Sequence, residues 1–141
     1  MSEMMPVVVL LSEIEKGLAV LQRIDEFYRS FLDKHKGDQL RSTENAVVIA
    51  DTLANYYTCL ETVFLRISQY FENTLARDKW HQDLLDKMTL ELQGVRERVI
   101  SEPTARLLGE LLRFRHFKRY YFELDYDWDR LEYVQRKYAQ V

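Results

Sequence analysis

The chain has 141 residues, of which 47% are hydrophobic and 30% charged, with four glycines and two prolines. This length allows one domain with a substantial buried core, and the composition is typical of a compact helical protein rather than a disordered or all-β one. A formal net charge of −3 argues against a generally basic nucleic-acid-binding protein, because the field of the whole molecule does not attract polyanions. We therefore expect residues 1–141 to form a single all-α domain.

The N-terminal residues and the cysteine content indicate where the protein works. An apolar run from Met4 to Leu11 lacks a basic flank and a small-residue cleavage site, and it is too short to span a bilayer. Cys59 is the only cysteine, so no intrachain disulfide forms and a reducing compartment fits. These observations predict a cytoplasmic protein without a membrane segment.

Two long helices are predicted first. Apolar residues recur at spacings of three and four from about 7 to 35, where Gly37 marks the end, and again from about 43 to Leu75. Ser42 or Thr43 can cap the second helix. Two helices of matched length joined by a short polar link pack antiparallel, which begins a bundle.

Three shorter helices follow. We expect one over about 79–92, with Asp78 as its cap and Gly94 as its end, whereas 95–100 is too short and mixed to assign. Ser101, followed by an acid and a proline, starts a helix that runs to about Arg119. Asp125 or Asp127 caps the last helix. The prediction is an up-and-down bundle of four main helices plus a short C-terminal helix, assembled as a homodimer.

The stretch from Leu111 to Leu124 turns from leucine-rich to basic and aromatic. At about 100° per residue, the stripe of Leu108, Leu111 and Leu112 continues through Arg115 and Arg119. Burying an unpaired charge costs several kcal/mol. These arginines are therefore either paired internally or line a cleft.

Local charge leaves two interpretations of this stretch open. Five basic residues between 106 and 119 face a single acid, whereas 123–132 carries five acids against one arginine. One interpretation is an anion or phosphodiester site, because guanidinium groups bind phosphate in bidentate fashion and an imidazole such as His116 transfers protons near neutral pH. The other is a charged helix end that pairs with Glu123, Asp125 and Asp127 or with the first helices.

No motif predicts a metal or a cofactor. The run Asp125–Asp129 imitates a calcium loop, but its sixth and twelfth positions are Arg130 and Arg136 instead of Gly and Glu. Trp80 and His81 are interpreted as a packing aromatic and a neighbouring surface or cleft histidine, since no metal-ligand spacing includes them. A Gly-rich phosphate loop and a nucleophile elbow are also absent from the sequence.

From about Val63 to Leu131 the order of features resembles the HepT-like branch of the HEPN superfamily, which are helical-bundle proteins of prokaryotic toxin and antitoxin pairs. The features are a helix ending in Arg66-Ile-Ser-Gln, then Trp80-His81, then Leu112-Arg-Phe-Arg-His-Phe, and finally Phe122-Glu-Leu-Asp before the last helix. The resemblance implies metal-independent RNA cleavage by an Arg-x4-His-x-Tyr motif in a cleft at a homodimer interface. It also implies a minimal nucleotidyltransferase antitoxin, which can neutralise such toxins by adenylylating the motif tyrosine.

Carried over to this chain, the motif arginine is Arg115 and the polar residue after it is His116, but the histidine position is Tyr120 and the tyrosine position is Phe122. A tyrosine phenol, with a reference pKa of about 10, cannot replace imidazole as a general base at neutral pH without a large pKa shift, and Phe122 has no hydroxyl to modify. His116 could substitute, although it points about a quarter-turn away from Arg115.

We therefore expect a HepT-like toxin–antitoxin component with a degenerate nuclease site that acts through homodimer and partner binding. The alternatives are a non-catalytic helical adaptor and an active ribonuclease that uses Arg115 and His116. The expected partners are a second copy, a nucleotidyltransferase antitoxin and single-stranded RNA. The catalytic candidates also include Tyr120, and the candidates for RNA or phosphate binding are Arg113, Lys118 and Arg119.

Overall fold

The computed structural model describes residues 4–72 and 80–141, and the regular elements in these residues are helices, without a strand. The expectation of an all-α protein is therefore confirmed over this part of the chain. A short 3₁₀ turn, η1 (Gly37–Leu40), joins the first two helices. The helices are α1 (Met4–Lys34), α2 (Thr43–Phe71), α3 (Trp80–Lys87), α4 (Glu102–Tyr120) and α5 (Trp128–Gln140).

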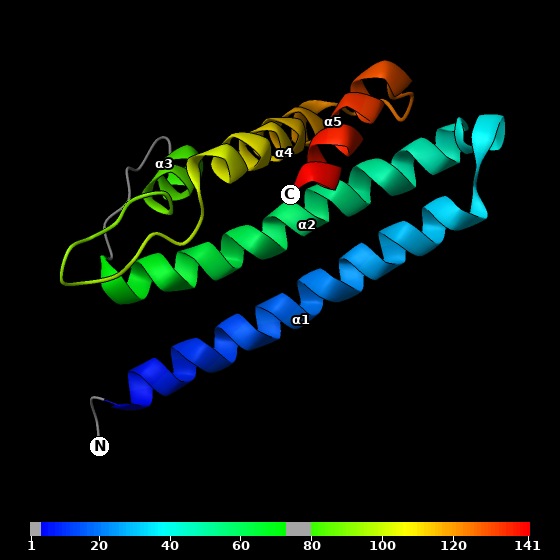
Figure 1. The fold of residues 1–141 in the computed structure, drawn as a ribbon. Helices are drawn as coiled ribbons and strands as arrows, with labels where there is room; N and C mark the ends of the chain where they lie inside the picture. The colour runs from blue at the N-terminus through cyan, green and yellow to red at the C-terminus, as the bar shows by residue number, and fades with distance from the viewer. Residues whose placement is uncertain (1–3, 73–79) are drawn as a thin grey trace.

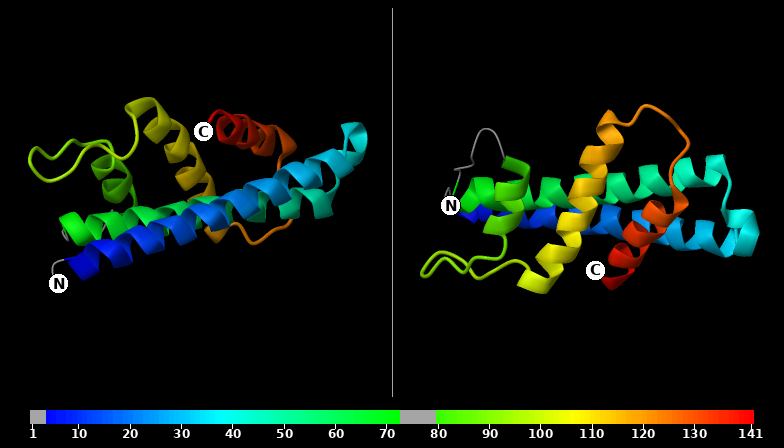
Figure 2. Two further views of the ribbon diagram at one scale, coloured as in Figure 1. Left: turned by 60° about the horizontal axis from the view of Figure 1, so that its bottom comes forward. Right: turned by 90° about the horizontal axis from the view of Figure 1, so that it is seen from above.

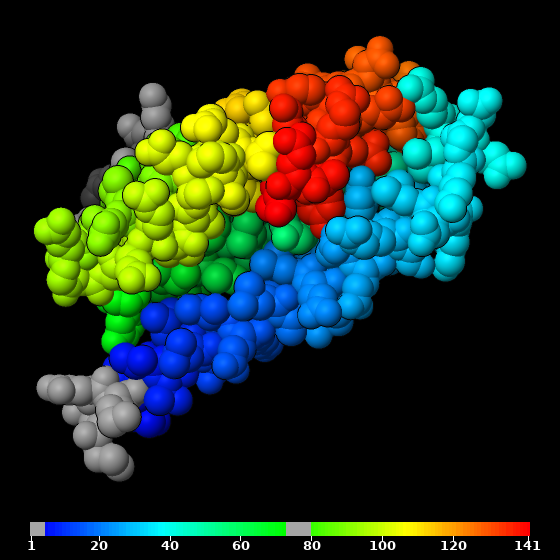
Figure 3. All heavy atoms as spheres, viewed as in Figure 1, coloured from blue at the N-terminus to red at the C-terminus, as the bar shows by residue number. Residues whose placement is uncertain are grey.

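Helix α2 is the centre of the arrangement, because it contacts each of the other four helices. The long helices α1 and α2 run antiparallel along the length of the molecule (Figure 1). Helices α4 and α5 form a second antiparallel pair that crosses the first pair obliquely (Figure 2). In the space-filling view, α5 sits between α4 and the turn that joins α1 to α2 (Figure 3).

The helix starts follow the sequence closely. The hydroxyl of Ser42 accepts a hydrogen bond from the backbone N–H of Asn45 at 3.1 Å, and that of Ser101 accepts one from Thr104 at 3.2 Å. Of the two aspartates considered for α5, Asp127 is the cap, accepting from the backbone N–H of Asp129 at 3.0 Å. Each cap satisfies one of the backbone donors that a helix start leaves unpaired.

The end of α3 differs from the prediction. The helix stops at Lys87 instead of continuing to Leu92, and Gly94 adopts a left-handed φ of 75° inside the following loop rather than ending the helix. The cause is Arg96, whose guanidinium donates to the carbonyl oxygens of Lys87 and Leu90, each at 2.9 Å. An arginine beyond the helix thus satisfies carbonyls that another helical turn would have used. The predicted cap Asp78 and the predicted end near Leu75 lie outside the described residues.

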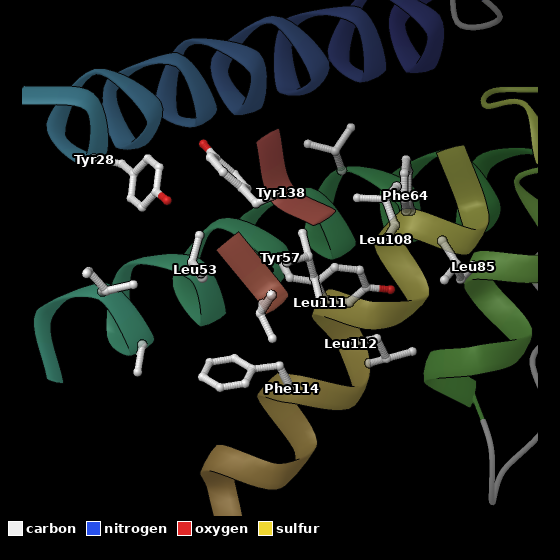
Figure 4. Close-up of a cluster of buried hydrophobic side chains, with 14 of the residues drawn as sticks. Tyr28, Leu53, Tyr57, Phe64, Leu85, Leu108, Leu111, Leu112, Phe114 and Tyr138 are labelled. Atoms are coloured by element: carbon white, nitrogen blue, oxygen red, sulfur yellow. The ribbon is translucent and has the colours of Figure 1, made fainter. Parts of the chain in front are cut away.

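The core collects on the face of α2 that meets α3, α4 and α5. Tyr57 is fully buried near its middle, and Leu53, Leu85, Leu108 and Leu111 around it are each at most 1% exposed (Figure 4). Full burial of one such leucine is worth about 2 kcal/mol. This packing holds the middle of α4, from Leu108 to Phe114, against α2 where the two helices cross. Among the helices that the structure describes, none is long and apolar enough to cross a membrane.

Candidate functional site

Arg115 lies on the inner face of α4, one turn beyond the buried leucines, and reaches across to α2. Its two terminal nitrogens donate to the two carboxylate oxygens of Glu61, each at 3.0 Å. The hydroxyl of Thr58 lies 3.3 Å from one of them, and the guanidinium carbon lies 5.0 Å from the centre of the Tyr57 ring. The side chain of Arg115 is 18% exposed and that of Glu61 only 8%. This is a bidentate, largely buried ion pair, the geometry in which arginine binds a carboxylate most strongly.

Glu61 also binds His81 of α3. The Nδ1 atom of His81 lies 2.8 Å from the second carboxylate oxygen and 3.2 Å from a guanidinium nitrogen of Arg115. Since arginine has no acceptor and the carboxylate has no proton, we assign the hydrogen to Nδ1, which donates to Glu61. One buried carboxylate thereby connects three helices, α2, α3 and α4.

A cleft of about 860 Å³ opens beside this cluster. Helix α2 forms its floor, the start of α3 forms one wall and the basic half of α4 forms the other. The lining residues are Ala54, Thr58, Trp80, His81, Gln82, Leu112, Arg113, Arg115, His116, Lys118, Arg119 and Tyr120. Arg115 is therefore paired internally and also lines a cleft, the two alternatives that its place on a core-facing stripe left open.

The remaining basic side chains of α4 differ in their partners. Arg113 pairs with Glu110 at 2.8 Å and Lys118 with Asp51 of α2 at 3.3 Å. Arg119 forms no ion pair with the described residues, and its guanidinium carbon lies 5.9 Å from the centre of the Tyr120 ring. Among the residues that the structure describes, Arg119 is thus the cleft arginine whose charge no neighbouring carboxylate compensates.

The acidic segment that follows α4 does not pair with these basic residues among the contacts of the described chain. Asp127 caps α5 instead, and the backbone carbonyl of Asp125 accepts from the Tyr121 hydroxyl at 2.7 Å. The carboxylates that bind the basic end of α4 come from α2, as with Glu61 and Asp51. Of the alternatives that the sequence left open, pairing with the first helices is the one observed.

The two altered motif positions lie apart from the ion-pair cluster. Tyr120 is the last residue of α4, lines the cleft and is 62% exposed, with its ring 5.0 Å from that of His116. Phe122 lies beyond the helix, is 86% exposed and does not line the cleft. The structure therefore brings Arg115, His116 and Tyr120 to one cleft but leaves Phe122 outside it.

Sequence reasoning missed Glu61 altogether and gave His81 no specific role. The sequence does contain a pattern that could have identified Glu61. It lies on a buried stripe of α2 that is formed by Tyr57, Glu61, Phe64 and Ser68. A carboxylate on such a stripe requires a cationic partner, as the guanidinium on the stripe of α4 requires an anionic one. Burial also raises the pKa of the Tyr57 phenol beside this pair, with the charge of Glu61 adding to the rise and that of Arg115 opposing it.

No group of three or more residues with metal-binding side chains occurs in residues 4–72 and 80–141. The cleft presents guanidinium, imidazole and hydroxyl groups beside one compensated carboxylate. Such groups bind oxyanions and transfer protons.

Comparison with known proteins supports the relationship that the sequence indicated. A family model described as "HepT-like protein" matches residues 48–141, which is two thirds of the chain. The match includes most of α2, all of α3, α4 and α5, and every residue that lines the cleft. Searches of curated proteins and of solved structures gave no match. Because the family model matches more than half of the sequence, the chain belongs to the HepT-like family.

Proposed function

We propose that this protein is the HepT-like component of a toxin–antitoxin pair and that its cleft binds single-stranded RNA through the phosphates. The observation that carries the proposal is the cleft of about 860 Å³ along the basic half of α4, in which Arg119 is not compensated by a carboxylate of the described chain. Arg113 and Lys118 add two further cations beside the same cleft. Phosphate contacts from lysine and arginine supply most of the sequence-independent affinity for nucleic acid.

The motif positions themselves support binding better than cleavage. Both terminal nitrogens of Arg115 are engaged by Glu61, so its charge is already compensated. Tyr120 places a phenol where the family motif has an imidazole. We therefore propose that the Arg-x4-His-x-Tyr motif of this chain is degenerate, with its arginine present and its histidine and tyrosine replaced.

The proposal includes two protein partners and a compartment. One partner is a second copy of the chain. A measured solution mass of 17.0 kDa at micromolar concentration, which is the mass of a single chain, would contradict the homodimer. A minimal nucleotidyltransferase antitoxin is the other, and it would act on this chain by docking rather than by modifying the position of Phe122, which lacks a hydroxyl. The proposal also takes the helices as an up-and-down bundle, with which the antiparallel pairs α1–α2 and α4–α5 are compatible (Figures 1 and 2). The compartment proposed for the protein is the cytoplasm.

Fluorescence anisotropy with a labelled single-stranded RNA of mixed sequence tests the binding site. We expect Arg119→Gln to bind about fivefold more weakly, since one charge-assisted phosphate contact contributes on the order of 1 kcal/mol. The matched control is Arg136→Gln, which removes an exposed arginine of α5 that does not line the cleft. No binding by the wild type, or equal losses in the two variants, would contradict the proposal and favour a non-catalytic adaptor.

A further inference from the structure

The imidazole of His81 is arranged to accept a proton inside the cleft. With the hydrogen assigned to Nδ1, the ring donates to Glu61 at 2.8 Å, and this contact orients the imidazole. In that tautomer Nε2 carries the lone pair, and no residue of the described chain forms a hydrogen bond with it. The side chain lines the cleft and is 38% exposed, so a ligand in the cleft has access to it. A carboxylate behind a histidine whose second nitrogen faces the substrate site is the arrangement of a general base.

The charges around this imidazole are compatible with a bound phosphate. The groups that face it are Glu61 from α2 and Arg115 from α4, and these two compensate each other. The negative charge of Glu61 therefore does not oppose an approaching phosphodiester. Arg119 and His116 line the same cleft and can face the phosphate.

We propose that His81, oriented by Glu61, is the proton acceptor for cleavage of RNA in this cleft and supplies from α3 the imidazole that the motif position Tyr120 lacks. This inference rests on the proposed RNA binding. It differs from the sequence-based alternative, in which His116 was the substitute.

The step is an internal transesterification. Nε2 of His81 takes the proton of a ribose 2′-hydroxyl as the 2′-oxygen forms a bond to the adjacent phosphorus. The bond from phosphorus to the 5′-oxygen breaks, and the leaving 5′-oxygen takes a proton from water. The imidazolium then returns its proton to the solvent, so the products are a 2′,3′-cyclic phosphate and a 5′-hydroxyl. Arg119 is the cation available to the charge that develops on the phosphate.

The chain contains three histidines, which allows a matched experiment. The full-length protein is incubated with a labelled single-stranded RNA and, separately, with DNA of the same sequence, which lacks the 2′-hydroxyl. We expect the wild type to cut only the RNA. His81→Asn should cut about 100-fold more slowly, the lower end of what a general base contributes, with RNA affinity changed less than twofold. His35→Asn is the control, because its ring binds the Phe31 carbonyl at the end of α1, outside the cleft.

The pH profile separates a proton acceptor from a residue that only anchors α3. We expect the wild-type rate to rise with pH, because only the neutral form of a histidine can accept a proton. His81→Asn should lose this rise. Glu61→Gln, which replaces the carboxylate behind the imidazole with a neutral and weaker acceptor, should cut about tenfold more slowly than the wild type.

Each other outcome has a defined meaning. RNA that is bound but not cut by the wild type overturns the role of His81 and leaves the proposed function standing, whereas failure to bind RNA overturns both. Cleavage that survives His81→Asn and is lost in His116→Asn assigns the proton transfer to His116. If His81→Asn loses its helical circular dichroism, the wild-type profile decides, and a cleavage rate that does not rise with pH overturns the inference.

Discussion

Glu61 is the residue on which the site depends. It is 6% exposed in the middle of α2, and it binds the guanidinium of Arg115 and the imidazole of His81 at the same time. Buried carboxylates are costly unless their charge is compensated and their oxygens accept hydrogen bonds, and both conditions are met here. The same contacts that make the carboxylate tolerable also fix the two side chains that face the cleft.

We expect Glu61→Gln to lower the free energy of unfolding by about 2 kcal/mol, because it leaves Arg115 with a largely buried charge and no anionic partner. The amide still accepts one hydrogen bond, so the loss is smaller than for removal of the whole side chain. Urea unfolding followed by circular dichroism measures the difference. The matched control is Glu110→Gln, which breaks the exposed pair with Arg113 and should cost under about 1 kcal/mol. Equal costs for the two variants would show that burial of the Glu61 pair has no energetic consequence.

At the scale of the elements, the close approach of α1 and α2 depends on Gly17. A Cβ atom at this position would lie 2.4 Å from a methyl carbon of Val63, far inside van der Waals contact. The backbone carbonyl of Gly17 also lies 3.8 Å from the sulfur of Cys59. A glycine inside a helix costs about 1 kcal/mol relative to alanine, and here that cost allows the two long helices to touch.

Gly17→Ala should therefore destabilise the protein by about 1–2 kcal/mol, since overpacking outweighs the gain in helix propensity. Gly109→Ala is the contrasting variant in α4, because its Cβ would meet only the flexible end of Arg113 at 3.6 Å, an ordinary contact. That variant should be stabilised by up to about 1 kcal/mol. Thermal and urea unfolding of both proteins check the signs. A stable Gly17→Ala protein would mean that α1 shifts away from α2 at little cost.

For the whole molecule, the distribution of charge matters more than its sum. The net charge of −3 provides no general attraction for RNA, so the proposed RNA binding would depend on the few cations gathered beside the cleft by α4. In the folded protein, carboxylates of α2 pair with Arg115 and Lys118, whereas Arg119 has no carboxylate partner from the described chain. Positive charge therefore remains beside the cleft. A mildly acidic protein can thus present a basic cleft.

The salt dependence of RNA binding reports how many phosphates this cleft holds. Arg113 and Lys118 are held in solvent-exposed ion pairs, which contribute little energy and which a phosphate can replace. Together with Arg119 they predict three phosphate contacts. At about −0.7 for each phosphate of a single strand, the logarithm of the affinity should fall with the logarithm of the salt concentration with a slope of about −2. In Arg119→Gln the slope should fall to about −1.4. Measuring the RNA affinity of both proteins at potassium chloride concentrations from about 50 mM to about 300 mM gives both slopes. A slope near zero would exclude phosphate contacts, and one steeper than about −4 would require a second basic surface.

Several features followed from the sequence because they depend on neighbours along the chain. The helical periods, the caps at Ser42, Ser101 and Asp127, and the basic end of α4 are all set within a few residues. The sequence failed at the end of α3, where Arg96 ends the helix through contacts with Lys87 and Glu72 that no local pattern indicates.

The sequence by itself determined that Arg115 occupies a core-facing stripe and therefore needs a partner or a cleft. Only the tertiary structure decided that it has both. Its partner Glu61 lies 54 residues earlier in the chain and His81 lies 34 residues earlier, on two other helices. The packing of α2, α3 and α4 against one another decides which of these side chains meet. That packing depends on many contacts between residues far apart in the chain, and the periodicity along a single helix does not reveal them.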